Sequence, residues 1–193
     1  MNDSSKGGRF RNVMGRFAGL SDEEVRRIIK EAAKKAAYYE EVYHGCCEAT
    51  LLGLLEAFDL PRDYVKLATG FAAGIGFKGL TCGALCGGVM AIGIFFGRSH
   101  LDYISGDPTK KRYVAFRLAK ELCEKFTQEY GSTLCKDIQV KILGKWYDLW
   151  DPKQHKEFEE VGAHTPKGCP SVTANAARWA AELILNEIKK MQR

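Results

Sequence analysis

The chain has 193 residues, of which 46% are hydrophobic and 27% are charged, and its formal net charge is +5. This length and composition are typical of one soluble domain with a sizeable core. A nucleic-acid-binding protein would need a longer basic stripe interleaved with aromatic side chains, so no nucleic-acid partner is expected.

Residues 1–20 carry four basic side chains and one acidic side chain. We expect them to form a flexible basic leader ahead of one helical domain over residues 21–193. The leader lacks the apolar central segment of a secretory signal, which favours a cytoplasmic, reducing location. In such a location, the seven cysteines indicate metal or redox chemistry rather than a framework of disulfides.

The first predicted helix covers residues 21–43. Ser21-Asp22-Glu23-Glu24 forms a capping box, and apolar residues then recur at helical spacing. After a glycine, a second apolar helix is expected over residues 46–58. Pro61 then begins a short helix that is expected to bury Leu67.

A glycine-rich loop over residues 74–88 precedes an apolar stretch that ends near Gly97. Glycines at this density indicate positive backbone dihedral angles or a close approach of two backbone segments. Residues 80–97 carry no charge, but this length is about the lower limit for a membrane span, and several glycines interrupt it. We therefore predict a buried central helix here and no membrane span.

A polar connection over residues 97–108 leads to a predicted helix over residues 110–130, which Gly131 ends in the position that glycine prefers. Ser132 is expected to cap a further helix, and Cys135 would then be its third residue.

The apolar side chains of residues 144–167 follow no helical or strand spacing. We therefore predict a long loop with one short helical turn, and such loops often cover a functional site. The last predicted helix starts at Cys169. No β-strand alternation persists anywhere, so the predicted fold class is all-α. We expect a single-domain bundle of about six to seven helices, in which the glycine-rich loop leads into the buried central helix.

Four cysteines share one local setting, because each falls at or beside a predicted helix start: Cys46, Cys82, Cys135 and Cys169. A thiol in this position faces unpaired amide N–H groups and the positive end of the helix dipole. This favours the thiolate, which binds metals and attacks disulfides. We therefore hypothesise that the four thiols converge on one site. Cys123, in contrast, is expected to be an ordinary buried apolar residue.

These cysteine motifs resemble a family of redox-active proteins that is named for its signature: one cysteine, a box of the form Gly/Cys-Gly/Cys-Ala-x-x-Gly, and two more cysteines. The box here is Cys82-Gly83-Ala84-Leu85-Cys86-Gly87. The first family cysteine matches Cys46 in Gly45-Cys46-Cys47-Glu48-Ala49-Thr50, and the last two match Cys135 and Cys169. The resemblance covers about residues 25–188.

The resemblance implies redox activity. A similar domain in split-Soret cytochrome c, where four cysteines suggest an iron–sulfur site, implies a [2Fe–2S] or [4Fe–4S] cluster as the cofactor. The implied ligands are Cys46, Cys82, Cys135 and Cys169. Cys47 and Cys86 are additional, and the sequence leaves open whether either is a ligand or a resolving thiol. No haem-attachment motif Cys-x-x-Cys-His occurs.

The sequence leaves three functions open, and with them whether the protein is an enzyme. The preferred one is electron transfer or redox sensing through the cluster, with a redox protein as partner. The second is a thiol–disulfide oxidoreductase that uses Cys82 with Cys86, or Cys46 with Cys47. The third is a zinc-stabilised helical module, although the usual short ligand pairs are missing. A homodimer is compatible with each of them.

The four histidines receive smaller roles. His44 lies close to Cys46 and is expected to be an alternative ligand or a hydrogen-bond donor beside the site. His100, His155 and His164 fall in predicted loops and are expected to be surface residues without a catalytic role.

Overall fold

The computed structural model of the chain describes residues 14–192. Within this range it contains ten helical elements and no strand, which confirms the all-α prediction and exceeds the expected helix count. The elements are α2 (Asp22–Tyr43), α3 (Cys46–Ala57), η1 (Arg62–Leu67), η2 (Thr69–Phe71), α4 (Gly83–Phe96), α5 (His100–Ile104), α6 (Arg112–Tyr130), α7 (Cys135–Leu143), α8 (Pro152–Glu160) and α9 (Cys169–Lys190).

Helix α4 lies at the centre of the bundle, as the sequence predicts. It contacts α3, α6 and α9, and α2 completes the bundle by packing on α3 and α9. A side chain at Gly87 would come within 2.6 Å of the Cys47 carbonyl oxygen, so glycine lets α3 and α4 approach closely. In the part of the chain that the structure describes, no helix has both the length and the apolar character that a bilayer crossing requires.

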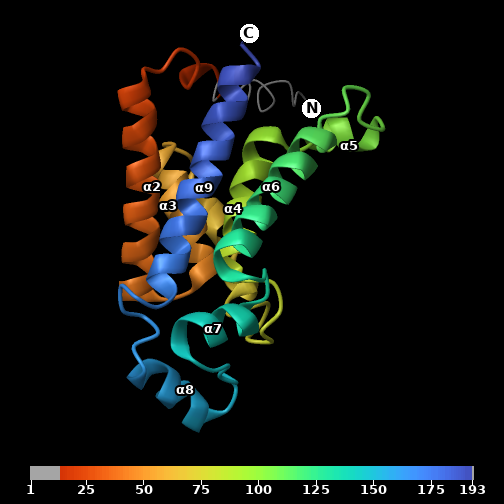
Figure 1. Cartoon of the computed structure of the whole chain (residues 1–193). Coiled ribbons are helices and arrows are strands. Elements are labelled where there is room, and N and C mark those ends of the chain that lie inside the picture. The colour runs from red at the N-terminus through yellow and green to blue at the C-terminus, as the bar shows by residue number, and fades with distance from the viewer. Residues whose placement is uncertain (1–13, 193) are drawn as a thin grey trace.

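One end of the bundle gathers several helix termini. Figure 1 shows that α3, α4 and α9 begin at the same end, that α2 and α6 finish there, and that α7 and α8 lie next to them. Each of these termini leaves backbone groups without helical partners, and those groups point toward this end. The candidate functional site is built here.

The N-terminal prediction needs one correction. The capping box is confirmed, because the Glu24 amide donates to Ser21 Oγ and the Glu24 carboxylate accepts from the Ser21 amide. Within the leader over residues 1–20, however, residues 14–20 pack on the core, where a flexible tail was expected. The Phe17 ring lies 5.2 Å from that of Phe58, and Arg16 pairs with Asp59 at 3.0 Å. Residues 1–13 of the leader lie outside the described residues.

The remaining differences concern short elements. The helix expected after Pro61 consists of two 3₁₀ segments, η1 and η2, and Leu67 is 63% exposed instead of buried. The polar connection over residues 97–108 contains α5, which a second capping box begins at Ser99. Such short helices carry too few apolar positions for their periodicity to be recognised in the sequence.

Candidate functional site

The four cysteines at predicted helix starts line one cavity of about 500 Å³ at this end of the bundle. They are Cys46, Cys82, Cys135 and Cys169. All seven cysteines of the chain are free thiols. Cys47, Cys86 and Cys123 are not among the residues that line the cavity. The structure therefore brings together the four candidate ligands and leaves the additional cysteines outside.

Each of the four thiols occupies a helix N-terminus. Cys46, Cys135 and Cys169 are the first residues of α3, α7 and α9, and Cys82 is the N-cap of α4. The expected caps were slightly misplaced. Ser132 Oγ accepts a hydrogen bond from the Leu134 amide just before α7, so Cys135 is the first helical residue and not the third.

Two loops pair to bring Cys82 next to Cys135. The Cys82 amide donates to the Thr133 carbonyl oxygen at 2.9 Å, and the Cys135 amide donates to the Leu80 carbonyl oxygen at 2.6 Å. Between them, Thr81 and Leu134 form an antiparallel bridge. This short pairing joins the end of the glycine-rich loop to the start of α7.

The glycine-rich loop has an uncommon backbone. Five consecutive residues have positive φ angles between 45° and 76°: Ala73, Gly74, Ile75, Gly76 and Phe77. The prediction of positive dihedral angles at glycines is confirmed, and three non-glycine residues share them. Each non-glycine residue costs about 1–2 kcal/mol in this region. Backbone strain of this kind clusters at functional sites, and this loop lines the cavity.

Glycine at position 83 allows a close approach of α4 to the Cys46 sulfur. A side chain there would clash with Cys46 Sγ and would lie 2.7 Å from the Phe71 carbonyl oxygen. A hydrogen bond from the Ala73 amide to the Cys46 sulfur lowers the pKa of this thiol, but burial raises it by more. Gly83 and the strained loop together fix the position of the first thiol.

Burial dominates the protonation of the cavity thiols. It raises the pKa of Cys46, Cys82 and Cys169 well above the usual range and that of Cys135 to about 12. The amides of Leu85 and Ala84 at the start of α4 lower the pKa of Cys82, but by less. The amides at the start of α4 thus favour the Cys82 thiolate in the predicted direction, but desolvation outweighs them in the metal-free chain.

The four thiols also act on one another. Negative charge on Cys46, Cys82 or Cys135 raises the pKa of Cys169, and Cys46 has the same effect on Cys135. Negative charge on Cys82 raises the pKa of Cys46, and negative charge on Cys135 raises the pKa of Cys82. Every pair among the four is thus close enough to interact. A set of thiolates here would repel one another strongly without a positive centre between them.

A histidine–carboxylate group lines the same cavity, and the sequence analysis missed most of it. His164 Nδ1 lies 3.2 Å from Glu40 Oε1, and His164 Nε2 lies 3.5 Å from Glu159 Oε1. His44 Nδ1 lies 4.0 Å from the same Glu159 oxygen. Only His44 was a candidate from sequence. His164 was expected at the surface, yet its side chain is only 16% exposed.

The predicted loop over residues 144–167 covers the cavity. It contains the nine-residue helix α8, where only one short helical turn was expected, and contributes Trp150, Phe158 and Glu159 to the lining. Trp150 Nε1 donates to the Gly76 carbonyl oxygen at 2.9 Å, which ties this cover to the strained loop. The expectation that the loop covers a site agrees with this arrangement.

The additional cysteines do not line the cavity but lie close to its thiols, since Cys86 raises the pKa of Cys82 and Cys135, and Cys47 raises that of Cys46. Cys86 and Cys47 interact electrostatically, and Cys123 contributes to raising the pKa of Cys86 to about 11. Cys123 packs against the core, as expected. Cys47 is fully buried, so it is inaccessible to a protein disulfide.

Comparisons with known proteins agree with the cysteine pattern. The model of one family, described as "Putative redox-active protein (C_GCAxxG_C_C)", matches residues 44–183, which include all four cavity cysteines. An uncharacterized protein of Archaeoglobus fulgidus is 27% identical over 120 residues, covering 61% of this chain and 76% of the relative. No solved structure matches the chain at a comparable level of significance.

Proposed function

Because the chain belongs to the C_GCAxxG_C_C family of redox-active proteins, we propose that it transfers electrons through an iron–sulfur cluster. The ligands in this proposal are the four cavity thiols, Cys46, Cys82, Cys135 and Cys169. The observation that carries it is their convergence from four separate helix starts on one cavity. Four thiolates are the usual ligand set of a [2Fe–2S] or [4Fe–4S] cluster.

A single metal ion bound by the thiols is less well supported. Among the described residues, the group with three metal-ligating atoms within 4.8 Å of one another is His44, Glu159 and His164, and the thiols do not form such a group. The ligands of one zinc ion must all reach the same atom. The ligands of a cluster bind different irons and therefore stand further apart.

The electrostatics of the cavity support the same proposal. The charges that act on the four thiols come mainly from one another and from Glu40. Thiolates would be costly here without a cationic centre. The N-termini of four helices direct amide dipoles at the cavity, and this positive potential offsets the net negative charge of a thiolate-bound cluster. When bound, the cluster would supply one-electron chemistry, and the chain would hold it, shield it and set its potential.

Thiol–disulfide exchange is less well supported. A reactive cysteine in that chemistry has a pKa near or below neutral. In this structure, burial raises the pKa of Cys82 and raises that of Cys86 to about 11. The electron partner in the proposal is another redox protein, and it would approach the end of the bundle that carries the cavity.

Anaerobic purification followed by iron and acid-labile sulfide analysis tests the proposal. We expect equal amounts of iron and sulfide, bound after purification or after reconstitution with ferrous iron and sulfide. Serine at any of the four cavity positions should lower the iron content to below half. Cys123→Ser and Cys47→Ser are controls, because the partly buried Cys123 and the buried Cys47 belong to the same bundle without lining the cavity.

Three outcomes would overturn the proposal. The first is protein that stays free of iron and sulfide after reconstitution. The second is stoichiometric zinc whose removal by a chelator unfolds the chain. The third is a disulfide-reductase activity that survives metal removal and disappears in Cys82→Ser. Circular dichroism of each variant shows whether a loss of iron reflects a lost ligand or a lost fold.

A further inference from the structure

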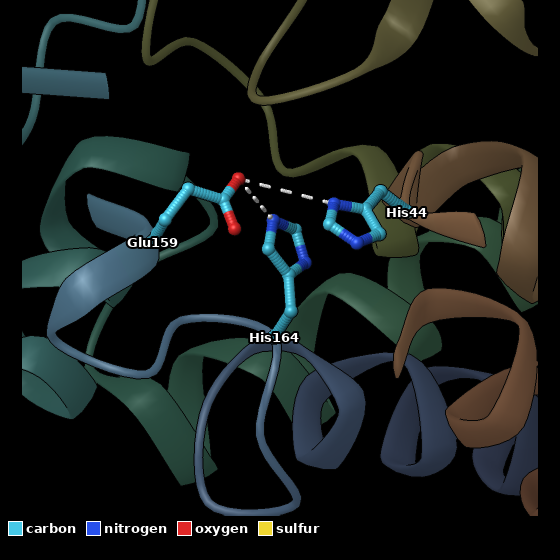
Figure 2. A group of neighbouring side chains, drawn as sticks. All are labelled: His44, Glu159 and His164. Carbon is cyan, nitrogen blue, oxygen red and sulfur yellow. Dashed lines mark ion pairs between the residues drawn. The ribbon is translucent and has the colours of Figure 1, made fainter. Parts of the chain in front are cut away.

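Three side chains from separate segments meet at the wall of the cavity. His44 follows α2, Glu159 lies in the last turn of α8, and His164 lies in the loop before α9. Figure 2 shows Glu159 facing both imidazole rings. One ligand atom from each residue lies within 4.8 Å of the other two. This group is separate from the four thiols, and the proposed cluster makes no use of it.

A buried carboxylate stands behind one of these histidines. Glu40 is 2% exposed, and its Oε1 lies 3.2 Å from His164 Nδ1. The contact is at ion-pair distance but lacks hydrogen-bond geometry, and His164 Nδ1 has no hydrogen-bond partner among the described residues. Metal-binding histidines commonly have such a carboxylate partner on their second nitrogen. Glu40 Oε2 has no hydrogen-bond partner among the described residues, and Glu40 lines the cavity.

The distances fit one metal ion after a small adjustment. Two ligand atoms on a tetrahedral ion, each bound at about 2.1 Å, stand roughly 3.4 Å apart. His164 Nε2 and Glu159 Oε1 are 3.5 Å apart, and His44 Nδ1 needs to move closer to Glu159 from 4.0 Å. The His44 side chain is 44% exposed, so the adjustment moves its ring against His164 on one side and solvent on the other.

The backbone holds His44 in an uncommon conformation. Its φ angle is 66°, and the following Gly45 is also left-handed. A non-glycine residue in this region is uncommon and costs free energy. The turn aims the imidazole back across the cavity, where its ring centre lies 3.6 Å from that of His164. The two imidazoles are therefore already assembled in the folded chain.

We propose that His44 Nδ1, His164 Nε2 and Glu159 Oε1 bind one divalent first-row transition-metal ion. Two imidazoles and one carboxylate suit zinc, ferrous or cobaltous ions, whereas calcium and magnesium prefer sites made wholly of oxygen ligands. Three protein ligands leave at least one coordination position open. Since all three residues line the cavity, that position faces the same space as the four thiols. The proposal does not depend on the cluster.

His155 provides a matched control within the same group. Its Nε2 lies 3.7 Å from Glu159 Oε1, and it lines the same cavity. Its Nδ1 faces the Leu149 carbonyl oxygen at 3.2 Å, and it does not belong to the three-ligand group. If the histidines were only a surface network around Glu159, His155 and His164 would matter equally.

Cobalt titration of the full-length, anaerobically prepared protein tests the proposal, with calorimetry and absorption spectroscopy as readouts. We expect one equivalent of Co²⁺ to bind with d–d bands and without a sulfur-to-cobalt charge-transfer band. His44→Gln, His164→Gln and Glu159→Gln should each weaken binding at least 100-fold, and His155→Gln less than threefold. Glu40→Gln should weaken it by about 10–100-fold, as expected for a carboxylate behind a metal-bound imidazole.

Two results would overturn the proposal: cobalt that shows only thiolate bands, or His155→Gln weakening binding as much as His164→Gln. Binding that is unchanged in all three ligand variants would do so as well. Iron and sulfide contents measured on the same samples keep the two proposals separate. A chain without iron that retains the cobalt bands contradicts the cluster alone, and a normal cluster without cobalt binding contradicts this site alone.

Discussion

The amide of Cys135 donates a hydrogen bond to the carbonyl oxygen of Leu80, with a nitrogen–oxygen distance of 2.6 Å. This bond joins the start of α7 to the residues just before Cys82 and belongs to the only β-type pairing among the described residues. Two thiols far apart in the chain thereby become neighbours. The polypeptide backbone sets their separation, so exchange of nearby side chains should alter it little.

The contact between Gly83 and Cys46 yields a direct prediction. In Gly83→Ala, the new methyl group would clash with Cys46 Sγ and would meet the Phe71 carbonyl oxygen at 2.7 Å. We expect a loss of about 1–3 kcal/mol in the free energy of unfolding, which is typical of overpacking. Iron uptake should fall as well, because Cys46 is displaced. Urea unfolding and iron analysis measure the two effects.

Gly93 in the same helix is the control. A methyl group there would meet nothing within 4 Å, so Gly93→Ala should stabilise the chain by up to about 1 kcal/mol through helix propensity. If both variants behave alike, the contact at Gly83 has no special role.

The helix starts could be predicted from the sequence because they depend on local chemistry. The capping box at Ser21 begins α2 through hydrogen bonds between neighbouring residues. Gly131 ends α6 because glycine readily adopts the left-handed conformation. The placement of four cysteines at such starts follows from the same signals. Their convergence was only a hypothesis, because it depends on the pairing around Thr81 and on helix packing, which no local pattern encodes.

Metal-free, reduced protein should lose stability as the pH rises above about 9. In the unfolded chain, a thiol deprotonates near its ordinary pKa of 9.0, whereas the pKa of folded Cys135 is raised to about 12. Between these values the folded state binds more protons, so the free energy of unfolding falls with pH. Each fully buried thiol contributes up to about 1.4 kcal/mol per pH unit.

Urea unfolding at about pH 8, 9 and 10 measures this dependence around the ordinary thiol pKa. Cys135→Ala should reduce the slope, since one of the buried thiols is removed. A free energy of unfolding that stays constant over this range would contradict the prediction.

Trp150 is expected to control the mobility of the strained loop. Trp150→Phe keeps an aromatic ring beside Phe77 but removes the hydrogen bond to the Gly76 carbonyl oxygen. Such a bond contributes about 1 kcal/mol. Amide hydrogen exchange over residues 74–80 should therefore accelerate about fivefold, with little change in α6. Unchanged exchange in this segment would show that Trp150 does not hold the cover in place.

Ile75 is a site where glycine should stabilise the folded state. It is 42% exposed and has a φ angle of 60°, which a β-branched residue adopts only with strain. Ile75→Gly relieves about 1–2 kcal/mol, and the greater freedom of glycine in the unfolded chain offsets about 0.5–1 kcal/mol of this. The net gain should be up to about 1 kcal/mol in thermal or urea unfolding.

Val140 is a control with an unstrained backbone, because it lies within helix α7 and its side chain is 49% exposed. Val140→Gly should destabilise the chain by a few tenths of a kcal/mol to about 1 kcal/mol. The same sign for both glycine variants would argue against strain at position 75.

The histidine–carboxylate group shows where sequence analysis stops. Glu40 and His44 are four residues apart, a spacing that places two side chains on one face of a helix, so this half of the group had a recognisable signal. Glu159 and His164 lie in a segment whose apolar residues follow no helical or strand spacing. Their position depends on how the cover folds over the cavity, and single loop histidines resemble surface residues.

Helix α9 packs against α2 and begins with Cys169, the last of the four cavity thiols. Any N-terminal fragment that ends before α9 therefore contains only three of the four. A cofactor that requires all four thiols can therefore be completely bound only after synthesis has passed Cys169. Deletion of α9 removes one ligand of the cavity together with the helix that packs on α2.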